Sequence, residues 1–178
     1  QSWRKGFKEI FFMNILEKNE MNISRNLNSN DIISDNYSFS PDGKKIIFSS
    51  DRTGSKNIYI MDVSGSNQIA LTNNSYENYN PSFSPDGKQI TFTSNRRSVL
   101  DVYVMDLDGS NQKNISLNNT NDWSSMFLPN GKDIIFLSDR DGNWEIYKVN
   151  IRTLRQTNLT NNPSTDYSFT ILPFISND

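Results

Sequence analysis

The sequence contains no cysteine and no histidine. The absence of cysteine excludes disulfide bonds, thiolate nucleophiles and cysteine-ligated zinc sites. The absence of histidine excludes Ser-His-Asp and Cys-His catalysis and any imidazole-bound metal. The chain also lacks the Gly-x-Ser-x-Gly turn of hydrolases, a Walker loop and a dinucleotide fingerprint. We therefore expect a protein that is not an enzyme and that needs no metal or other cofactor.

The sequence also has no excess of positive charge and no long apolar run. The 178 residues carry 18 Lys and Arg against 20 Asp and Glu, a formal net charge of −2. Because the basic residues are spread thinly, we expect no nucleic-acid partner. Apolar stretches such as Ile10–Met13 are far shorter than the roughly 20 residues of a membrane span. The chain shows no signal peptide, which leaves its compartment open.

The sequence does contain an internal repeat of 44 residues. Six columns recur in strict register over three copies: Gly43, Gly87 and Gly131; Phe48, Phe92 and Phe136; Tyr59, Tyr103 and Tyr147; Leu71, Ile115 and Leu159; Arg52, Arg96 and Arg140; Ser50, Ser94 and Ser138. At an offset of 48, a further partial copy matches the first of these three: Ser2, Arg4, Gly6, Lys8, Ile10 and Met13 match Ser50, Arg52, Gly54, Lys56, Ile58 and Met61. Such a period indicates a repeat architecture.

Each repeat reads as four short strands. In one copy, residues 82–84 and 89–93 flank a Pro-Asp-Gly-Lys turn, in which proline presets φ and glycine supplies a positive φ. Residues 102–105 form a third strand rich in β-branched and aromatic residues. An Asp-Gly turn then leads to a fourth strand at 113–116. A repeated unit of four strands and 40–50 residues is typical of a propeller blade.

We therefore predict an all-β fold, a β-propeller of four-stranded antiparallel blades with about four 44-residue repeats. A partial blade covers 1–30, full blades cover 31–74, 75–118 and 119–162, and a further blade starts at 163–178. The repeats leave two arrangements open. One is a four-bladed ring that both ends of the chain seal. The other is a partial propeller or open arc, whose edge strands could pair with another copy of the chain.

The repeat resembles those of the TolB-like β-propeller family. The resemblance rests on the Pro-Asp-Gly-Lys turns at 41–44 and 85–88, on the segments Phe48–Arg52, Phe92–Arg96 and Phe136–Arg140, and on the strands Ile58–Asp62 and Val102–Asp106. It covers nearly the whole chain, although the α/β domain that precedes the propeller in the family is absent from it. The resemblance implies a periplasmic or extracellular module that binds a protein or peptide partner on one face. It leaves open a gating propeller of a prolyl-oligopeptidase-like hydrolase and a carbohydrate-binding or carbohydrate-active propeller.

The candidate binding residues lie just before the first strand of successive blades and in one loop. They are Asn78, Tyr79, Arg96, Arg97, Asp122, Trp123, Asp166 and Tyr167. The aromatic members either pack blades together or form a partly exposed ring that anchors a ligand. The Asp members are the positions that a carbohydrate-active propeller could use for catalysis.

Other recurring polar residues are expected to be structural. Asp42 and Asp86 should hydrogen-bond the amides of their own turns. The arginines that end each Phe-x-Ser-x-Arg segment should form loop salt bridges or pack across blades. Residues 139–143 resemble the opening of a calcium loop, but position 12 of that loop is Asn150 in place of glutamate. We interpret this segment as a hairpin loop.

Overall fold

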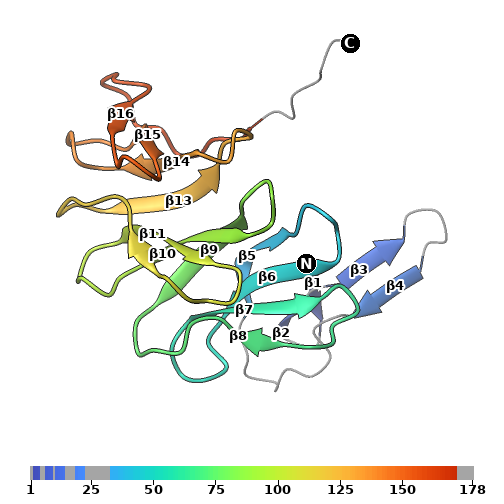
Figure 1. Ribbon diagram of the computed structural model, residues 1–178. Helices are drawn as coiled ribbons and strands as arrows, with labels where there is room; N and C mark the ends of the chain where they lie inside the picture. The colour runs from blue at the N-terminus through green and yellow to red at the C-terminus, as the bar shows by residue number, and fades with distance from the viewer. Residues whose placement is uncertain (1, 5–6, 10, 15–18, 23–32, 172–178) are drawn as a thin grey trace, which may run out of the picture.

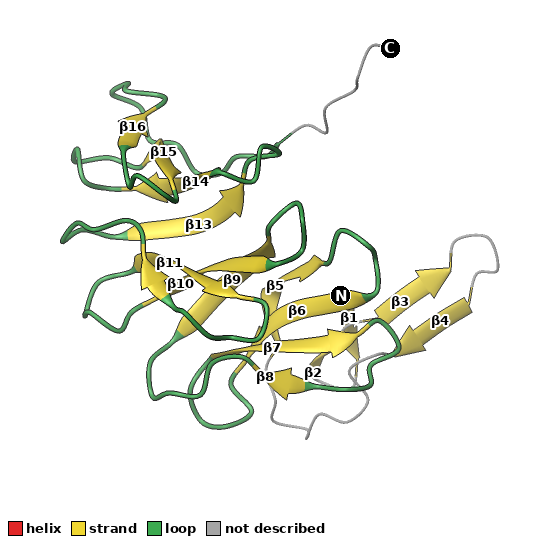
Figure 2. Ribbon diagram, viewed as in Figure 1, coloured by secondary structure: helices red, strands yellow, loops and turns green. Residues whose placement is uncertain are grey.

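The fold consists of strands and loops. The computed structural model describes residues 2–4, 7–9, 11–14, 19–22 and 33–171, and within these ranges it contains sixteen strands and no helix (Figures 1 and 2). The described residues therefore confirm the prediction of an all-β protein.

Three four-stranded antiparallel sheets follow one another along the chain, each a simple meander. The first blade contains β5 (Ile33–Phe39), β6 (Lys45–Ser50), β7 (Asn57–Asp62) and β8 (Ile69–Ala70). The second contains β9 (Asn78–Phe83), β10 (Gln89–Ser94), β11 (Asp101–Asp106) and β12 (Lys113–Asn114). The third contains β13 (Asp122–Phe127), β14 (Asp133–Ser138), β15 (Glu145–Asn150) and β16 (Gln156–Asn158). Four-stranded antiparallel blades are thus confirmed.

The blades pack face to face through their first strands. Strand β9 contacts both β5 and β13, so the first strand of each blade is the inner one (Figure 1). The buried side chains form clusters that span two blades: Ile47 and Ile58 pack with Phe92, and Val102 packs with Phe136. Because each cluster needs residues from two sheets, a single blade cannot bury its own apolar surface.

The four-bladed ring that the repeats left open is not formed by the described residues. Strands β1 (Ser2–Arg4) and β2 (Phe7–Glu9) pair with each other, and β3 (Phe11–Asn14) pairs with β4 (Asn19–Asn22), as two separate two-stranded sheets. Strand β2 lies against β5, at the opposite end of the array from the third blade (Figure 1). Residues 163–171 form no strand. The described fold is therefore an array of three blades.

The Pro-Asp-Gly-Lys turns are closed by their own aspartates. The hydroxyl of Ser84 donates a hydrogen bond of 2.7 Å to Oδ1 of Asp86, and the backbone N–H of Lys88 donates one of 3.1 Å. Asp42 accepts equivalent bonds. These donors, led by the serine hydroxyl, lower the pKa of Asp86 from its ordinary value. The structural role predicted for both aspartates is confirmed.

One glycine has a role that reaches beyond its own turn. Gly109, at φ +87°, lies so close to the first blade that an added Cβ would sit 2.4 Å from the carbonyl oxygen of Leu71. Gly142 has a similar φ of +96° with open space around it. Gly109→Ala thus combines a strained backbone with a clash, whereas Gly142→Ala has only the strain.

We expect Gly109→Ala to lower the free energy of unfolding by about 2–4 kcal/mol and Gly142→Ala by about 1–2 kcal/mol. Urea denaturation followed by circular dichroism measures both. Equal losses would show that the approach of the turn to Leu71 is not a close one.

Candidate functional site

The same side-chain arrangement recurs in every blade around the repeated arginine. In the second blade the guanidinium of Arg96 lies 4.2 Å from the ring centroid of Tyr103 and 5.6 Å from that of Phe92. Its Nε donates to Ser94 Oγ at 3.1 Å and its Nη2 donates to Gln112 Oε1 at 2.9 Å. Arg52 and Arg140 repeat these contacts in the first and third blades. Cation–π contacts and hydrogen bonds thus hold each arginine rigidly.

Of the two roles expected for these arginines, the salt bridge is observed for Arg140, which pairs with Asp122 at 3.2 Å. The ring contacts of all three arginines lie within a blade and not across blades. Each one packs on the rings of its own blade, because the two strands that flank its loop carry those rings. A polar contact between the second and third blades is made by Gln156, whose Nε2 donates to the carbonyl oxygens of Ile115 and Ser116 at 3.3 and 2.6 Å. The sequence analysis missed this glutamine, although Gln68, Gln112 and Gln156 are themselves 44 residues apart.

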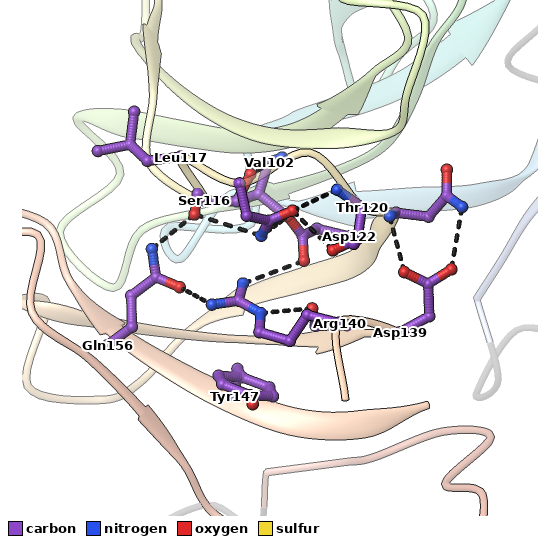
Figure 3. A network of polar contacts seen from close by, with 12 residues as sticks. Val102, Ser116, Leu117, Thr120, Asp122, Asp139, Arg140, Tyr147 and Gln156 are labelled. Atoms are coloured by element: carbon purple, nitrogen blue, oxygen red, sulfur yellow. Dashed lines mark hydrogen bonds and ion pairs between the residues drawn. The ribbon is translucent and has the colours of Figure 1, made fainter. Parts of the chain in front are cut away.

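Two of the predicted binding residues are buried and serve this arrangement. Asn78 and Asp122 are 0% exposed. Asn78 accepts a hydrogen bond of 3.4 Å from Arg96, and Asp122 forms an ion pair of 3.2 Å with Arg140 (Figure 3). A partner cannot reach either side chain in this fold, so they position the residues around them.

The ion pair of Asp122 lies in a network that joins the second and third blades. Asn118 Nδ2 donates to Asp122 Oδ2 at 2.7 Å. The guanidinium of Arg140 also donates to Oε1 of Gln156 at 2.6 Å (Figure 3). Burial raises the pKa of Asp122 from its ordinary value, and this effect outweighs the hydrogen bonds from Ser138, Ser116 and Asn118 and the charge of Arg140. The carboxyl group is thus strongly desolvated and depends on its partners.

Tyr79 and Trp123 form a pair that bridges two blades. Their ring centroids lie 5.3 Å apart at an interplanar angle of 54°, and both side chains are partly exposed. Lys56 Nζ lies 5.0 Å from the centroid of Tyr79. Each ring is followed by a residue with positive φ, Asn80 at 49° and Ser124 at 54°, within a β-bulge of the inner strand. Such bulges re-aim side chains at the ends of sheets.

Arg97 follows the end of β10, which pairs with the start of β9 beside Tyr79, and so lies at the same end of the sheet. The side chain of Arg97 is 43% exposed and lies 3.5 Å from Asp101, which is fully buried. Its guanidinium also donates to the backbone oxygen of Asn118 at 3.4 Å and to Oδ1 of Asn119 at 3.2 Å. Leu117 is 56% exposed and has a φ of +50°, a conformation that leucine rarely adopts. We call Lys56, Tyr79, Arg97, Leu117 and Trp123 the aromatic face.

The other two predicted residues, Asp166 and Tyr167, follow the last strand of the third blade. Asp166 and Tyr167 line a pocket of about 200 Å³ together with Trp123, Leu137 and Trp144. Tyr167 is 85% exposed and forms no ring pair in the described residues. Trp144 escaped the sequence analysis because the equivalent positions are lysine and leucine, so no repeated residue type marks it.

The aromatic face combines an aromatic pair at the starts of two inner strands, two cations and an exposed leucine. Among the described residues, no three acidic side chains lie together in a way that could hold a metal ion. The same residues include no helix of the length and apolarity needed to cross a membrane.

The comparisons with known proteins point to one family of propellers. The family model for the TolB beta propeller domain matches residues 68–173. A search of curated proteins finds no match.

Solved structures show the same fold. TolB from Acinetobacter baumannii is 30% identical, with a TM-score of 0.69 over 84% of this chain and 37% of that chain. A protein assigned as TolB from Agrobacterium tumefaciens is 22% identical, with a TM-score of 0.74 over 86% of this chain and 57% of that chain. Dipeptidyl peptidase 4 from Porphyromonas gingivalis is 16% identical, with a TM-score of 0.68 over 88% and 23%. The chain therefore spans little more than half, or less, of each of these structures.

Proposed function

Because the chain belongs to the TolB beta-propeller family, we propose that it is a non-enzymatic binding and scaffolding module that recognises a protein or peptide segment. The partner binds the aromatic face. Family membership also supports a location in the periplasm or outside the cell, where TolB-type propellers act.

The observation that carries this proposal is the Tyr79–Trp123 pair. Rigid aromatic side chains anchor interfaces, since they bury much area at little cost in conformational entropy. The two rings are partly exposed, and each directly follows a buried residue in the chain, Asn78 or Asp122. Exposed Leu117 adds apolar area, and Arg97 and Lys56 favour a segment that carries carboxylates.

A peptide selection tests the proposal. A random peptide library displayed on phage is panned against the folded protein, and the affinity of enriched peptides is measured by fluorescence anisotropy. We expect Trp123→Ala to weaken binding at least tenfold, which corresponds to about 1.4 kcal/mol. The arginine network should keep the variant folded, so its circular dichroism spectrum should match that of the wild type.

Ile69→Ala is the matched control for this prediction. Ile69 is an apolar side chain that is 59% exposed on the outer strand β8, away from the aromatic face. Its truncation should leave the affinity unchanged. The proposal would be wrong if no peptide were enriched, or if Trp123→Ala and Ile69→Ala bound the enriched peptides equally well.

A further inference from the structure

The second blade departs from the repeat in the loop between its second and third strands. Residues 95–100 read Asn-Arg-Arg-Ser-Val-Leu, whereas the equivalent loops read Asp-Arg-Thr-Gly-Ser-Lys at 51–56 and Asp-Arg-Asp-Gly-Asn-Trp at 139–144. The loop of the second blade has two arginines and no acidic residue, and each of the other two contains at least one aspartate. The second blade therefore presents the most basic of the three loops.

The arginine that is peculiar to this loop, Arg97, has a buried carboxylate beside it. Asp101 is 0% exposed, and its Oδ1 lies 3.5 Å from Nη1 of Arg97. Its Oδ2 is buried without a hydrogen-bond partner among the described residues, which costs stability. The first blade has the neutral Thr53 and Asn57 at these two positions, and there the hydroxyl of Thr72 donates to Asn57 Oδ1 at 2.9 Å. The second blade thus keeps a costly buried carboxylate, which holds a cation at the surface.

Two residues of the second blade have a backbone conformation that their side chains disfavour. Ser98 has a φ of +68°, whereas the equivalent residues are Gly54 at +98° and Gly142 at +96°. Leu117 has a φ of +50°, whereas the equivalent residue of the third blade, at +43°, is Asn161. Glycine and asparagine adopt this left-handed region far more readily than serine or leucine. Strained residues of this kind cluster at ligand-binding and active sites.

Arg97 and Leu117 present a cation and an apolar side chain on two loops that contact each other. The side chain of Arg97 is 43% exposed and Leu117 is 56% exposed. The guanidinium donates to the backbone oxygen of Asn118, the residue after Leu117, at 3.4 Å. Its other polar contacts among the described residues, to Asn119 and Asp101, are 3.2 and 3.5 Å long. Because a guanidinium has five N–H donors, donors remain for a carboxylate of a partner.

We propose that Arg97 binds an aspartate or glutamate side chain of the partner segment and that Leu117 packs on an apolar residue beside it. This inference rests on the proposed function and adds the class of partner, a segment in which an acidic residue lies next to an apolar one. The Tyr79–Trp123 pair supplies affinity, and the two loops of the second blade select the sequence. Asp101 is a positioning residue, which acts through Arg97.

The double variant Arg97→Thr/Asp101→Asn tests the role of the arginine. It installs the neutral pair of the first blade, so no carboxylate is left buried without its cation. The probes are a peptide enriched in the phage selection, synthesised with both ends blocked, and its analogue in which the acidic residue is replaced by the amide. By fluorescence anisotropy, the wild type should bind the acidic peptide at least about tenfold more tightly than the amide. The double variant should bind both peptides equally.

Leu117→Asn tests the role of the strained leucine. Because asparagine tolerates the left-handed conformation, the variant should unfold at a higher urea concentration than the wild type. It should nevertheless bind the acidic peptide at least about fivefold more weakly, since the apolar contact is lost. The reverse exchange in the third blade, Asn161→Leu, is the matched control. It should lower the urea midpoint and leave the affinity unchanged.

The results separate this inference from the proposed function. Enriched peptides without acidic residues would overturn the inference. So would a double variant that still prefers the acidic peptide over the amide, or a Leu117→Asn variant that binds as tightly as the wild type. In each of these cases a loss of binding in Trp123→Ala would leave the proposed function standing. A selection that enriched no peptide would overturn both.

Discussion

Arg140→Ala is expected to lower the free energy of unfolding by about 3–5 kcal/mol, because it leaves the carboxylate of Asp122 buried without a counter-charge. Asp122 is 0% exposed, and its ion pair with Arg140 is 3.2 Å long. The variant also loses the cation–π contact with Tyr147 and the hydrogen bond to Gln156. The measurement is urea denaturation at pH 7, followed by circular dichroism.

The second blade supplies a matched control for the charge. Arg96 makes the same ring and glutamine contacts as Arg140, but its buried partner is the neutral Asn78. Arg96→Ala is therefore expected to destabilise by only about 1–2 kcal/mol. The double variant Asp122→Asn/Arg140→Ala should be more stable than Arg140→Ala alone. Equal losses for Arg96→Ala and Arg140→Ala would show that the buried charge is not what makes Arg140 important.

The effect of Arg140→Ala should also depend on pH. Burial raises the pKa of Asp122 above the value of about 3.9 in an unfolded chain. Such a group stabilises the fold in its protonated form below the unfolded pKa, and this contribution is lost as the pH rises through the folded pKa. The difference in stability between wild type and Arg140→Ala should therefore be smaller at pH 4 than at pH 7.

Phe92→Ala is expected to have an effect of similar size, about 3–5 kcal/mol, because it opens a cavity in the core between two blades. Phe92 is 0% exposed and lies in one cluster with Ile47 and Ile58 of the first blade. Its ring stacks on Tyr103 at 5.7 Å and carries the guanidinium of Arg96. Phe92→Ala therefore removes the contacts between the two blades and also the ring on which the guanidinium of Arg96 packs.

Phe39→Ala is the control for the loss of an aromatic ring. Phe39 is 45% exposed at the end of β5, so its truncation should destabilise by less than about 1.5 kcal/mol. Thermal and urea denaturation of the three proteins test the comparison. If Phe92→Ala had the same melting temperature and free energy of unfolding as Phe39→Ala, the first and second blades would not share a core.

The blade architecture was predictable because turns and alternation are local properties of the sequence. The Pro-Asp-Gly-Lys turns set the ends of β9 and β10, and the predicted strand at 89–93 is observed as Gln89–Ser94. The prediction was less accurate for β9, which begins at Asn78 and not at residue 82, since a β-bulge interrupts its alternation. Bulges depend on pairing with the neighbouring strand, which a local pattern does not reveal.

The sequence predicted where the candidate site residues lie better than it predicted which of them are exposed. The columns of Tyr79 and Trp123 identified the strand ends that form the aromatic face. The burial of Asn78 and Asp122 was missed, because it depends on an arginine 18 residues away that folds back over its own blade. Repeat equivalence also concealed the difference between Trp123, which packs on Tyr79, and Tyr167, which has no such neighbour in the described residues.

Hydrogen exchange with and without a selected peptide tests the central claim, that the protein binds through its aromatic face, most directly. The account predicts slower exchange in two loops, 95–100 and 117–121, when the peptide is bound, and unchanged exchange in the outer strands β8, β12 and β16. Protection confined to those outer strands, with the two loops exchanging as in the free protein, would contradict it.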